Sequence, residues 1–161
     1  MVQLNPMTEQ EYEDFMVISM KDQADGHVQD GEWSAEQAQE NIEKLRSEFL
    51  PNDLDTPNHF FFTIMESASG VKVGGLWYLM MEEAGKRQFL VLDIQIYDGY
   101  RRNGYGSQAF QMMEEKGKEM GVSIISLHVF RQNYSARAMY EKLGYVGFPG
   151  SDSNMYKDLL E

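Results

Sequence analysis

The chain has 161 residues, 42% of them hydrophobic, which favours a single domain over residues 1–161 that buries roughly 70% of its unfolded surface. It has no cysteine, which excludes disulfides, thiolate nucleophiles and cysteine-based zinc or iron–sulfur sites. It also has no apolar run that approaches the roughly 20 residues of a membrane span. We therefore expect a cytoplasmic protein without a membrane partner. Its formal net charge is −12, and residues 1–60 hold fourteen Asp and Glu against three Lys and Arg, a field that repels nucleic acid and attracts cationic ligands.

The N-terminus predicts a short strand followed by a capped helix. Apolar and polar residues alternate over residues 1–7, as they do in a half-buried strand. Thr8 and Glu11 have the spacing of a capping box, in which each side chain accepts a hydrogen bond from the backbone of the other at the start of a helix. The buried face of this helix would hold Tyr12, Phe15, Met16 and Ser19.

An acidic loop and a second helix come next. Residues 21–33 contain two glycines among several acids, and we expect them to interrupt the first helix as a loop. Ser34, followed by Gln37, caps a second helix that ends before Pro51. Its apolar residues keep helical spacing and predict a buried stripe of Ala38, Ile42, Leu45 and Phe49.

The rest of the chain predicts most of a mixed sheet. Residues 59–65, 71–81 and 88–96 are rich in β-branched and aromatic residues and are joined by short polar linkers, which predicts an antiparallel meander of three strands. Amphipathic helices are expected on either side of a strand at residues 123–130. Two more strands are expected at the C-terminus, around residues 145–148 and 154–159. This order predicts a mixed sheet covered by helices.

The stretch YDGYRRNGYGSQAF, residues 97–110, has the outline of three phosphate-binding devices. A Walker loop needs a lysine where Tyr105 stands. Gly104, Gly106 and Ala109 fit the dinucleotide-binding pattern. That pattern should directly follow a strand and should precede an acidic residue that binds the ribose. Neither condition holds here, which disfavours NAD as the ligand. The remaining alternative is a helix N-terminus whose backbone N–H groups bind an anion beside arginine charge.

This stretch resembles the [QR]-x-x-G-x-[GA] motif of the GCN5-related N-acetyltransferase (GNAT) superfamily, which binds the pyrophosphate of acetyl-coenzyme A (acetyl-CoA). Residues 126–148 are similar to a strand, a helix and the next strand of that family, with Asn133 and Tyr140 at its spacing. The resemblance covers residues 58–148 most strongly. It implies an α+β fold, a mixed α/β sandwich with a GNAT-like, mostly antiparallel sheet of about six to seven strands flanked by about four helices. It also implies direct attack of a primary amine on acetyl-CoA in a ternary complex, with no covalent enzyme intermediate.

The resemblance assigns acetyl-CoA, as cosubstrate, to one strand and two loops. The pyrophosphate would be bound by Arg101, Arg102, Asn103, Gly104, Gly106 and Ser107. Backbone groups of Ile94 and Ile96 would pair with pantetheine as with a neighbouring strand, and one N–H would polarise the acetyl carbonyl. Asn133 would bind pantetheine, cap its helix, or do both, and Arg137 would either reach a cofactor phosphate or lie in solvent.

Tyr140 is the expected general acid, because the resemblance places its phenol at the leaving sulfur; the same residue also fits a core aromatic position. The general base stays open between three alternatives. Asp93 lies within an apolar strand, where an unpaired carboxylate is costly to bury. His128 is the second, since histidine exchanges protons near neutral pH, and a water relay is the third. With His27 and His59 scattered elsewhere, the three histidines predict no metal site.

The acceptor site would be bordered by the acidic loop, in which the resemblance places four candidate residues. These are His27, Asp30, Glu32 and Trp33. Such a loop could bind an ammonium group by charge and by cation–π contact, or could be a variable surface loop. We expect the acceptor to be a small cationic amine, or else a peptide or protein amine. The alternative function is a non-catalytic acyl-CoA-binding sensor or interaction module, and edge strands are compatible with a homodimer.

Overall fold

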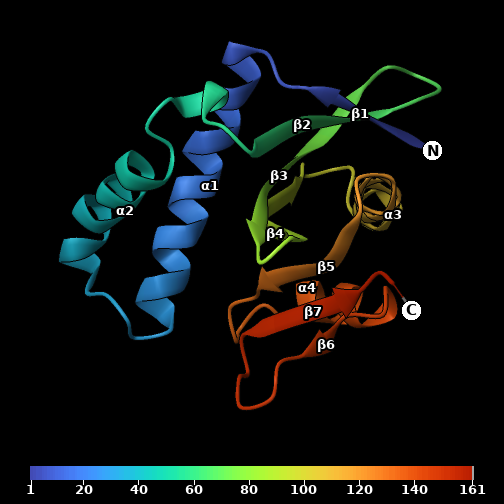
Figure 1. Ribbon diagram of the computed structural model, residues 1–161. Coiled ribbons are helices and arrows are strands. Elements are labelled where there is room, and N and C mark those ends of the chain that lie inside the picture. Colours follow the sequence, from blue (N-terminus) through green and yellow to red (C-terminus); the bar gives the residue numbers. More distant parts are fainter. Residues whose placement is uncertain (161) are drawn as a thin grey trace.

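A seven-stranded mixed sheet forms the centre of the protein, with α1 and α2 on one side and α3 and α4 on the other (Figure 1). The computed structural model describes residues 1–160. The strands are β1 (Val2–Pro6), β2 (His59–Glu66), β3 (Lys72–Glu83), β4 (Lys86–Ile96), β5 (Val122–His128), β6 (Val146–Gly147) and β7 (Asn154–Asp158). The helices are α1 (Glu9–Gln29), α2 (Ala35–Phe49), α3 (Tyr105–Glu119) and α4 (Tyr134–Lys142), with the short 3₁₀ helix η1 (Asp53–Asp55) before β2. Neighbours in the order β1-β2-β3-β4-β5-β7-β6 are antiparallel except β4 and β5, which confirms the predicted α+β fold.

Each face of the sheet has its own hydrophobic core. The core on the α1 side is centred on Tyr12, Phe15, Met16, Phe61 and Trp77. The core under α3 and α4 is larger and includes Val91, Phe110, Met113, Ile125 and Tyr145. The buried face expected for the first helix is confirmed, because its four predicted residues are all buried. The two cores place β4, between β3 and β5, in contact with helices on both sides.

β4 and β5 part before β4 ends. Their parallel pairing runs from Arg87 and Val122 to Val91 and Leu127 and then stops. At the same point β4 carries a bulge, since Trp77 of β3 pairs with Asp93 while the next residue of β3 pairs with Val91. A bulge bends its strand and increases the local twist. The last residues of β4 therefore pair with β3 alone, and the place where β4 and β5 part is called the opening.

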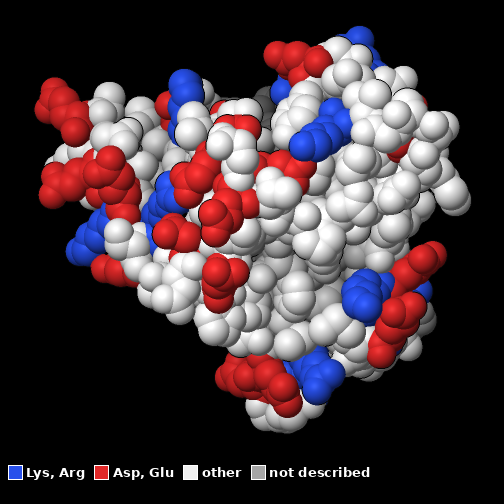
Figure 2. All heavy atoms as spheres, turned by 90° about the horizontal axis from the view of Figure 1, so that it is seen from above, with Lys and Arg blue, Asp and Glu red and all other residues white. Residues whose placement is uncertain are grey.

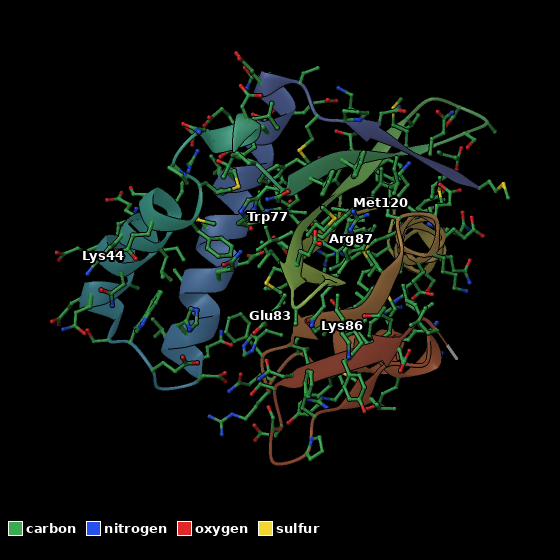
Figure 3. The ribbon with its side chains drawn as sticks, viewed as in Figure 1. Lys44, Trp77, Glu83, Lys86, Arg87 and Met120 are labelled. Atoms are coloured by element: carbon green, nitrogen blue, oxygen red, sulfur yellow. The ribbon has the colours of Figure 1, made fainter. Side chains whose placement is uncertain are left out.

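The opposite end of the β4–β5 pair is held closed. Arg87, at the start of β4, donates a hydrogen bond from Nη1 to the carbonyl oxygen of Met120 at the end of α3, at 2.8 Å (Figure 3). Ser123 Oγ donates to the carbonyl oxygen of Arg87 at 3.2 Å. These bonds join β4 to the turn between α3 and β5, so the two strands separate only at their carboxyl ends.

The first helix is longer than the sequence predicts, and the loop expected at residues 21–33 is wrong. α1 continues to Gln29, and the loop begins only at Asp30. The prediction took Gly26 as a helix-breaking residue. Gly26 is instead buried within the helix, where a Cβ atom would lie 2.3 Å from the ring of Phe130. This glycine allows α1 to approach the segment after β5 closely, and it does not end the helix.

The two helix caps are confirmed, but the buried stripe of α2 is only half right. Thr8 and Glu11 form the predicted capping box, and Ser34 accepts from the N–H of Gln37 at 3.2 Å. On α2, Ala38 and Ile42 are buried as expected, whereas Leu45 and Phe49 are 44% and 41% exposed. The reason is that α2 packs mainly on α1, at the edge of the molecule, and has little contact with the sheet (Figure 1).

Two kinds of feature are absent from residues 1–160. Within residues 1–160, no helix has the length and apolar character to cross a membrane. Over the same residues, no three His, Asp or Glu side chains come together as metal ligands would.

Candidate active site

Backbone groups of β4 point into the opening between β4 and β5. The N–H of Tyr97 donates to the carbonyl of Val73 on β3 at 2.9 Å. Because backbone groups alternate in direction along a strand, those of Ile96 and Ile94 point away from β3 and towards the opening. This direction is supported by the carbonyl oxygen of Ile96, which accepts a hydrogen bond from Arg101 Nε at 3.0 Å and not from β3. At both isoleucines β4 has no second strand partner within residues 1–160, although the Ile96 carbonyl is bonded to Arg101 and the Ile94 N–H to the Asp93 carboxylate.

The loop from β4 to α3 presents a row of backbone N–H groups. Gly99, Arg102 and Gly104 have positive φ angles of 89°, 67° and 77°. Among residues 1–160, no atom accepts a hydrogen bond from the N–H groups of residues 102–107. A Cβ atom on Gly104 would find nothing nearer than 3.8 Å, so the loop is open at this glycine. A pyrophosphate group fits this concavity, because an anion satisfies such N–H groups at the positive end of a helix dipole.

Gly106 has a different role in the same motif. It is buried in the first turn of α3, where a Cβ atom would lie 3.1 Å from the sulfur of Met139 on α4. The same Cβ would lie 3.8 Å from the side chain of Ile96. Its lack of a side chain lets α3 pack closely against both elements, and this contact helps to place α4 beside the opening.

The polar side chains of the loop bind the loop itself. Arg101 makes an ion pair with Asp98 at 3.3 Å, in addition to its bond to β4. Asn103 donates to the carbonyl oxygen of Tyr100 at 3.0 Å. The hydroxyl of Tyr105, the first residue of α3, hydrogen-bonds Glu66 at the end of β2. These bonds fix the loop between β4 and the start of α3.

The two candidate residues at the start of α4 also have partners within the protein. Asn133 accepts a hydrogen bond from the N–H of Ala136 at 3.3 Å and so caps α4. Arg137 donates to the backbone carbonyl of Asp152, in the turn before β7. Either side chain would have to share or exchange this bond in order to bind a cofactor.

Tyr140 lies in the core beside the opening. Its ring centroid is 5.4 Å from that of Phe110, and the side chain is buried. Burial raises the pKa of Tyr140 well above the usual 10, and the negative charge of Asp93 raises it further. The structure therefore brings Tyr140, from α4, within electrostatic range of Asp93, from β4. A phenol in this environment stays protonated at neutral pH and can only give a proton.

Asp93 is partly buried on β4 and hydrogen-bonded on the side of α1. It accepts a bond from the Gln95 amide at 3.1 Å and another from the Ser19 hydroxyl. Burial raises the pKa of Asp93 to about 6. The charge of Asp22 acts in the same direction, and the hydrogen bonds from Ser19, Gln95 and the Ile94 backbone offset part of the effect. Asp93 is thus mostly ionised at neutral pH and can accept a proton.

Ser19 and Asp22 belong to this site but were not predicted as site residues. Ser19 was assigned to the buried face of the first helix, and Asp22 to a loop. With α1 continuous, Phe15, Ser19 and Asp22 follow the i, i+4, i+7 spacing of one helix face. This spacing places Asp22 over the sheet, but a loop predicted at residues 21–33 hides it.

His128 is exposed at the end of β5, on the far side of the opening. Its Nδ1 lies 3.2 Å from the side-chain oxygen of Asn154 on β7, and its ring meets Phe130 edge-on at 4.9 Å between centroids. The hydrogen bond through Nδ1 orients the ring.

The four predicted acceptor residues lie together at the end of α1. His27 is in the helix itself, stacks on Trp33 at 4.2 Å and pairs with Glu32 at 3.2 Å. Asp30 is nearly buried beside the guanidinium of Arg131, at 3.7 Å. Through Arg131 and its neighbours, this corner packs against the segment that joins β5 to α4.

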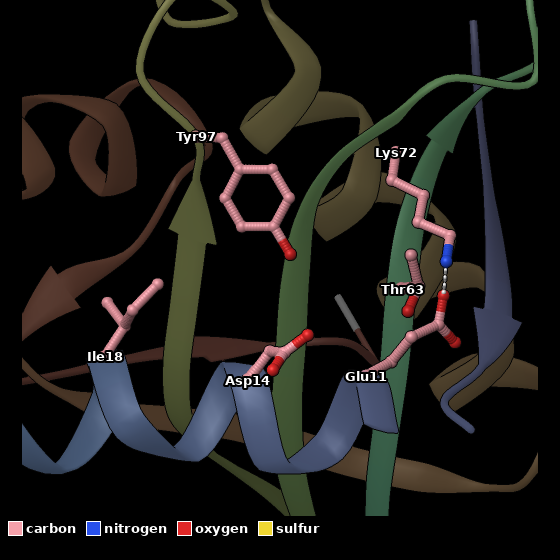
Figure 4. Close-up of a pocket in the computed structure, with 6 residues that line it drawn as sticks. All are labelled: Glu11, Asp14, Ile18, Thr63, Lys72 and Tyr97. Atoms are coloured by element: carbon pink, nitrogen blue, oxygen red, sulfur yellow. Dashed lines mark ion pairs between the residues drawn. The ribbon is translucent and has the colours of Figure 1, made fainter. Parts of the chain in front are cut away.

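A hollow of about 310 Å³ lies between α1 and the end of β4 (Figure 4). Its lining residues are Glu11, Asp14, Ile18, Thr63, Lys72 and Tyr97. Lys72 forms an ion pair with Glu11, which holds the pKa of Glu11 below its usual range although burial opposes the change. Acidic side chains gather on the side of the molecule formed by α1 and α2, on the left of Figure 2. Two acids of α1, Glu11 and Asp14, line the hollow.

Comparison with known proteins agrees with this geometry. A family model described as the acetyltransferase (GNAT) family matches residues 26–145. The N-acetyltransferases YycN and YdgE of Bacillus subtilis are 31% and 30% identical, over 98% and 89% of this chain and 99% and 90% of their own lengths. The crystal structure of YycN has a TM-score of 0.86 at 29% identity, covering 94% of this chain and 96% of its own. The spermidine N-acetyltransferase of Vibrio cholerae, in complex with CoA and spermine, shares the fold, with a TM-score of 0.66, 13% identity, and 99% and 98% of the two chains covered. The chain belongs to the acetyltransferase (GNAT) family.

Proposed function

We propose that the protein transfers an acetyl group from acetyl-CoA to a primary amine, with both substrates bound at once. The observation that carries the proposal is the row of unpaired N–H groups over residues 102–107, next to the free edge of β4. A ligand with a pyrophosphate at one end and amide groups along its length would satisfy both features. When bound, acetyl-CoA supplies an acetyl thioester that is reactive towards amines.

The binding roles follow from position. The loop residues Arg101, Arg102, Asn103, Gly104, Gly106 and Ser107 would hold the pyrophosphate. Ile94 and Ile96 would pair with pantetheine through their backbone groups, and one of their N–H groups would stabilise the oxyanion. Asn133 would donate to pantetheine from its amide nitrogen while its oxygen still caps α4. Arg137 would exchange the Asp152 carbonyl for a cofactor phosphate.

The chemical roles are divided across the opening. Asp93, from the α1 side, would take a proton from the attacking amine, directly or through a water molecule, and His128 is the alternative base. The amine nitrogen then bonds to the acetyl carbon and the carbon–sulfur bond breaks. Tyr140 would give its proton to the departing sulfur, because its buried phenol is protonated at neutral pH. No covalent bond to the protein is needed at any step.

The acceptor would approach from the acidic side of the molecule. The charge of residues 1–60 favours a small cationic amine over a peptide or protein amine. The corner of His27, Asp30, Glu32 and Trp33 would border this approach. Its side chains bind one another and Arg131, so we assign the corner to shaping the site more than to direct contact with the acceptor.

Calorimetry with acetyl-CoA tests the proposal first. Gly104→Glu puts a carboxylate into the open loop and should abolish the micromolar binding expected of the unmodified protein. Gly85→Glu is a matched control, because Gly85 has the same φ of 77° and an open surrounding, in the distant turn between β3 and β4. Binding that survives Gly104→Glu, or that Gly85→Glu also abolishes, would contradict the assigned cofactor site.

An amine screen with detection of the released thiol then tests catalysis. Thiol release that requires both acetyl-CoA and an amine supports the transferase. Tight binding of acetyl-CoA without transfer to any amine would favour the alternative, a non-catalytic acyl-CoA-binding module.

A further inference from the structure

One side of α1 carries two acids separated by an apolar residue. Asp14, Ile18 and Asp22 occupy positions i, i+4 and i+8 of the helix, so their side chains form a single row. Ile18 is 43% exposed, although it is one of the larger apolar residues. Figure 4 shows Asp14 and Ile18 on the side of α1 that faces the end of β4. An exposed aliphatic side chain between two carboxylates matches a hydrocarbon chain between two cations.

The first end of the row lies in the hollow. Asp14 accepts a hydrogen bond from Gln10 at 2.9 Å, and within residues 1–160 no Lys or Arg pairs with it. Lys72 is already paired with Glu11, so the hollow keeps one uncompensated carboxylate. The hydroxyl of Tyr97 faces Asp14 across the hollow (Figure 4). Burial raises the pKa of Tyr97, as do the charges of Glu11 and Asp14, which places the phenol in their field.

The second end of the row lies at the reacting carboxylate. The charge of Asp22 acts on Asp93, which places the two acids near each other, and the charges of Lys21 and Arg101 act on Asp22 in the opposite direction. Next to them, Gln95 uses its amide nitrogen twice, towards Asp93 at 3.1 Å and the carbonyl of Phe15 at 3.2 Å. The amide oxygen of Gln95 is buried and has no hydrogen-bond partner among residues 1–160. An unpaired buried acceptor next to the Asp93 carboxylate calls for a donor, and an ammonium group offers three N–H bonds.

The spacing of the two ends defines the ligand. Eight residues separate Asp14 from Asp22, which is about 12 Å along a helix. We propose that the acceptor is a linear aliphatic diamine, with one amine at Asp22 and Asp93, the other ammonium at Asp14 and Tyr97, and its hydrocarbon chain over Ile18. This inference rests on the proposed function and names the class of acceptor.

The chemistry of the bound diamine follows. Asp93 takes one proton from the near ammonium, the nitrogen–carbon bond forms as the carbon–sulfur bond breaks, and Tyr140 protonates the sulfur. The second proton of the nitrogen then passes through water to the Tyr140 phenolate and restores the phenol. The far ammonium keeps its charge throughout. The product has lost the cation that Asp22 attracts, so the site binds it more weakly than the substrate, which favours release.

Steady-state kinetics with matched amines tests the inference. Diaminobutane, diaminohexane and diaminooctane are compared with butylamine, hexylamine and octylamine at saturating acetyl-CoA. We expect the diamines to have the higher kcat/KM, by about tenfold for the best length, through a lower KM. Asp14→Asn should reduce this preference about fivefold and act on KM more than on kcat. Asp22→Asn should raise the KM of both kinds of amine, because it acts at the shared reacting end.

Asp25→Asn is the matched control, since it removes the same charge from α1. Asp25 is paired with Lys21 at 2.7 Å and does not belong to the row. The preference for diamines should survive this change. Equal kcat/KM for diamines and monoamines, or an equal effect of Asp14→Asn and Asp25→Asn, would overturn the inference and leave the proposed function intact. Failure of every amine to accept an acetyl group would overturn both.

Discussion

The amide of Gln95 donates a hydrogen bond to the carboxylate of Asp93 at 3.1 Å, at the bulge where β4 leaves β5. The same amide nitrogen also reaches the carbonyl oxygen of Phe15 on α1. Gln95 thus links the carboxylate of Asp93 to α1 by hydrogen bonds. The bond favours the ionised form of Asp93, but burial and the charge of Asp22 outweigh it.

The raised pKa of Asp93 predicts an acid limb in the rate profile. Because the carboxylate must be ionised to accept a proton, kcat/KM should fall about tenfold per pH unit below about 6, the pKa of Asp93. Asp93→Asn should remove the limb together with most of the activity. Initial rates between pH 5 and 8, in buffers of constant ionic strength, measure the profile. A limb that persists in Asp93→Asn would assign it to another group, and His128→Gln would then be tested in the same way.

The carboxylate of Asp93 is expected to destabilise the folded protein at neutral pH. A carboxyl whose folded pKa lies above its unfolded value binds protons more tightly in the folded state, so its unfavourable effect on stability grows as the pH rises from about 4 to about 6. Above that window Asp93→Asn should therefore be more stable than the unmodified protein, by about 1 to 3 kcal/mol. Urea unfolding at pH 8 and at pH 4 checks this. A variant that is equally destabilised at both pH values would show that the carboxylate stabilises the fold.

Tyr140→Phe should separate binding from chemistry. The variant keeps the ring packed against Phe110 and loses only the proton donor, so kcat should fall by on the order of a hundredfold while the affinity for acetyl-CoA stays the same. Tyr134→Phe is the control on the same helix, since Tyr134 is 76% exposed. Single-turnover rates and calorimetry provide the two measurements. An unchanged kcat in Tyr140→Phe would remove this residue from the mechanism.

Most of the architecture could be predicted because it depends on local patterns. Each signal used lies within a few neighbouring residues of the sequence. These signals are the capping box at Thr8, the strand periodicity of residues 59–96 and the glycines around Gly104. The bulge on β4 could not be predicted in this way. It depends on how Asp93 and Val91 pair with β3, which is a relation between strands and leaves no local signal.

The acceptor side shows the opposite case, in which a local pattern misled. Glycine within an acidic stretch is typical of a loop, and the sequence offers no sign that Gly26 faces Phe130, over a hundred residues later. The error moved His27 out of the helix and hid the helical spacing of Asp14, Ile18 and Asp22. Tertiary contact decided the helix length, and with it the position of the anionic row.

The contact at Gly26 gives a direct test of that explanation. Alanine favours a helix over glycine by about 1 kcal/mol, yet Gly26→Ala should destabilise the protein by about 1 to 3 kcal/mol, because its Cβ would lie 2.3 Å from the Phe130 ring. Urea unfolding gives the free-energy change. Adding Phe130→Leu, which makes room for the Cβ, should recover part of the loss. A more stable Gly26→Ala would show that the glycine is not needed for packing.

His59 predicts a further dependence of stability on pH. Its Nδ1 accepts a hydrogen bond from Trp77 Nε1 at 3.0 Å and must be unprotonated to do so. Burial lowers the pKa of His59 below the usual 6.5, so the unfolded chain takes up the proton first as the pH falls. The stabilising contribution is therefore present above about 6.5 and is lost as the pH falls through the lower folded value. His59→Gln keeps an acceptor for Trp77 and cannot titrate in this range. The Tm difference between the unmodified protein and His59→Gln should thus shrink or reverse from pH 8 to pH 5, whereas a constant difference would show that His59 does not titrate in this window.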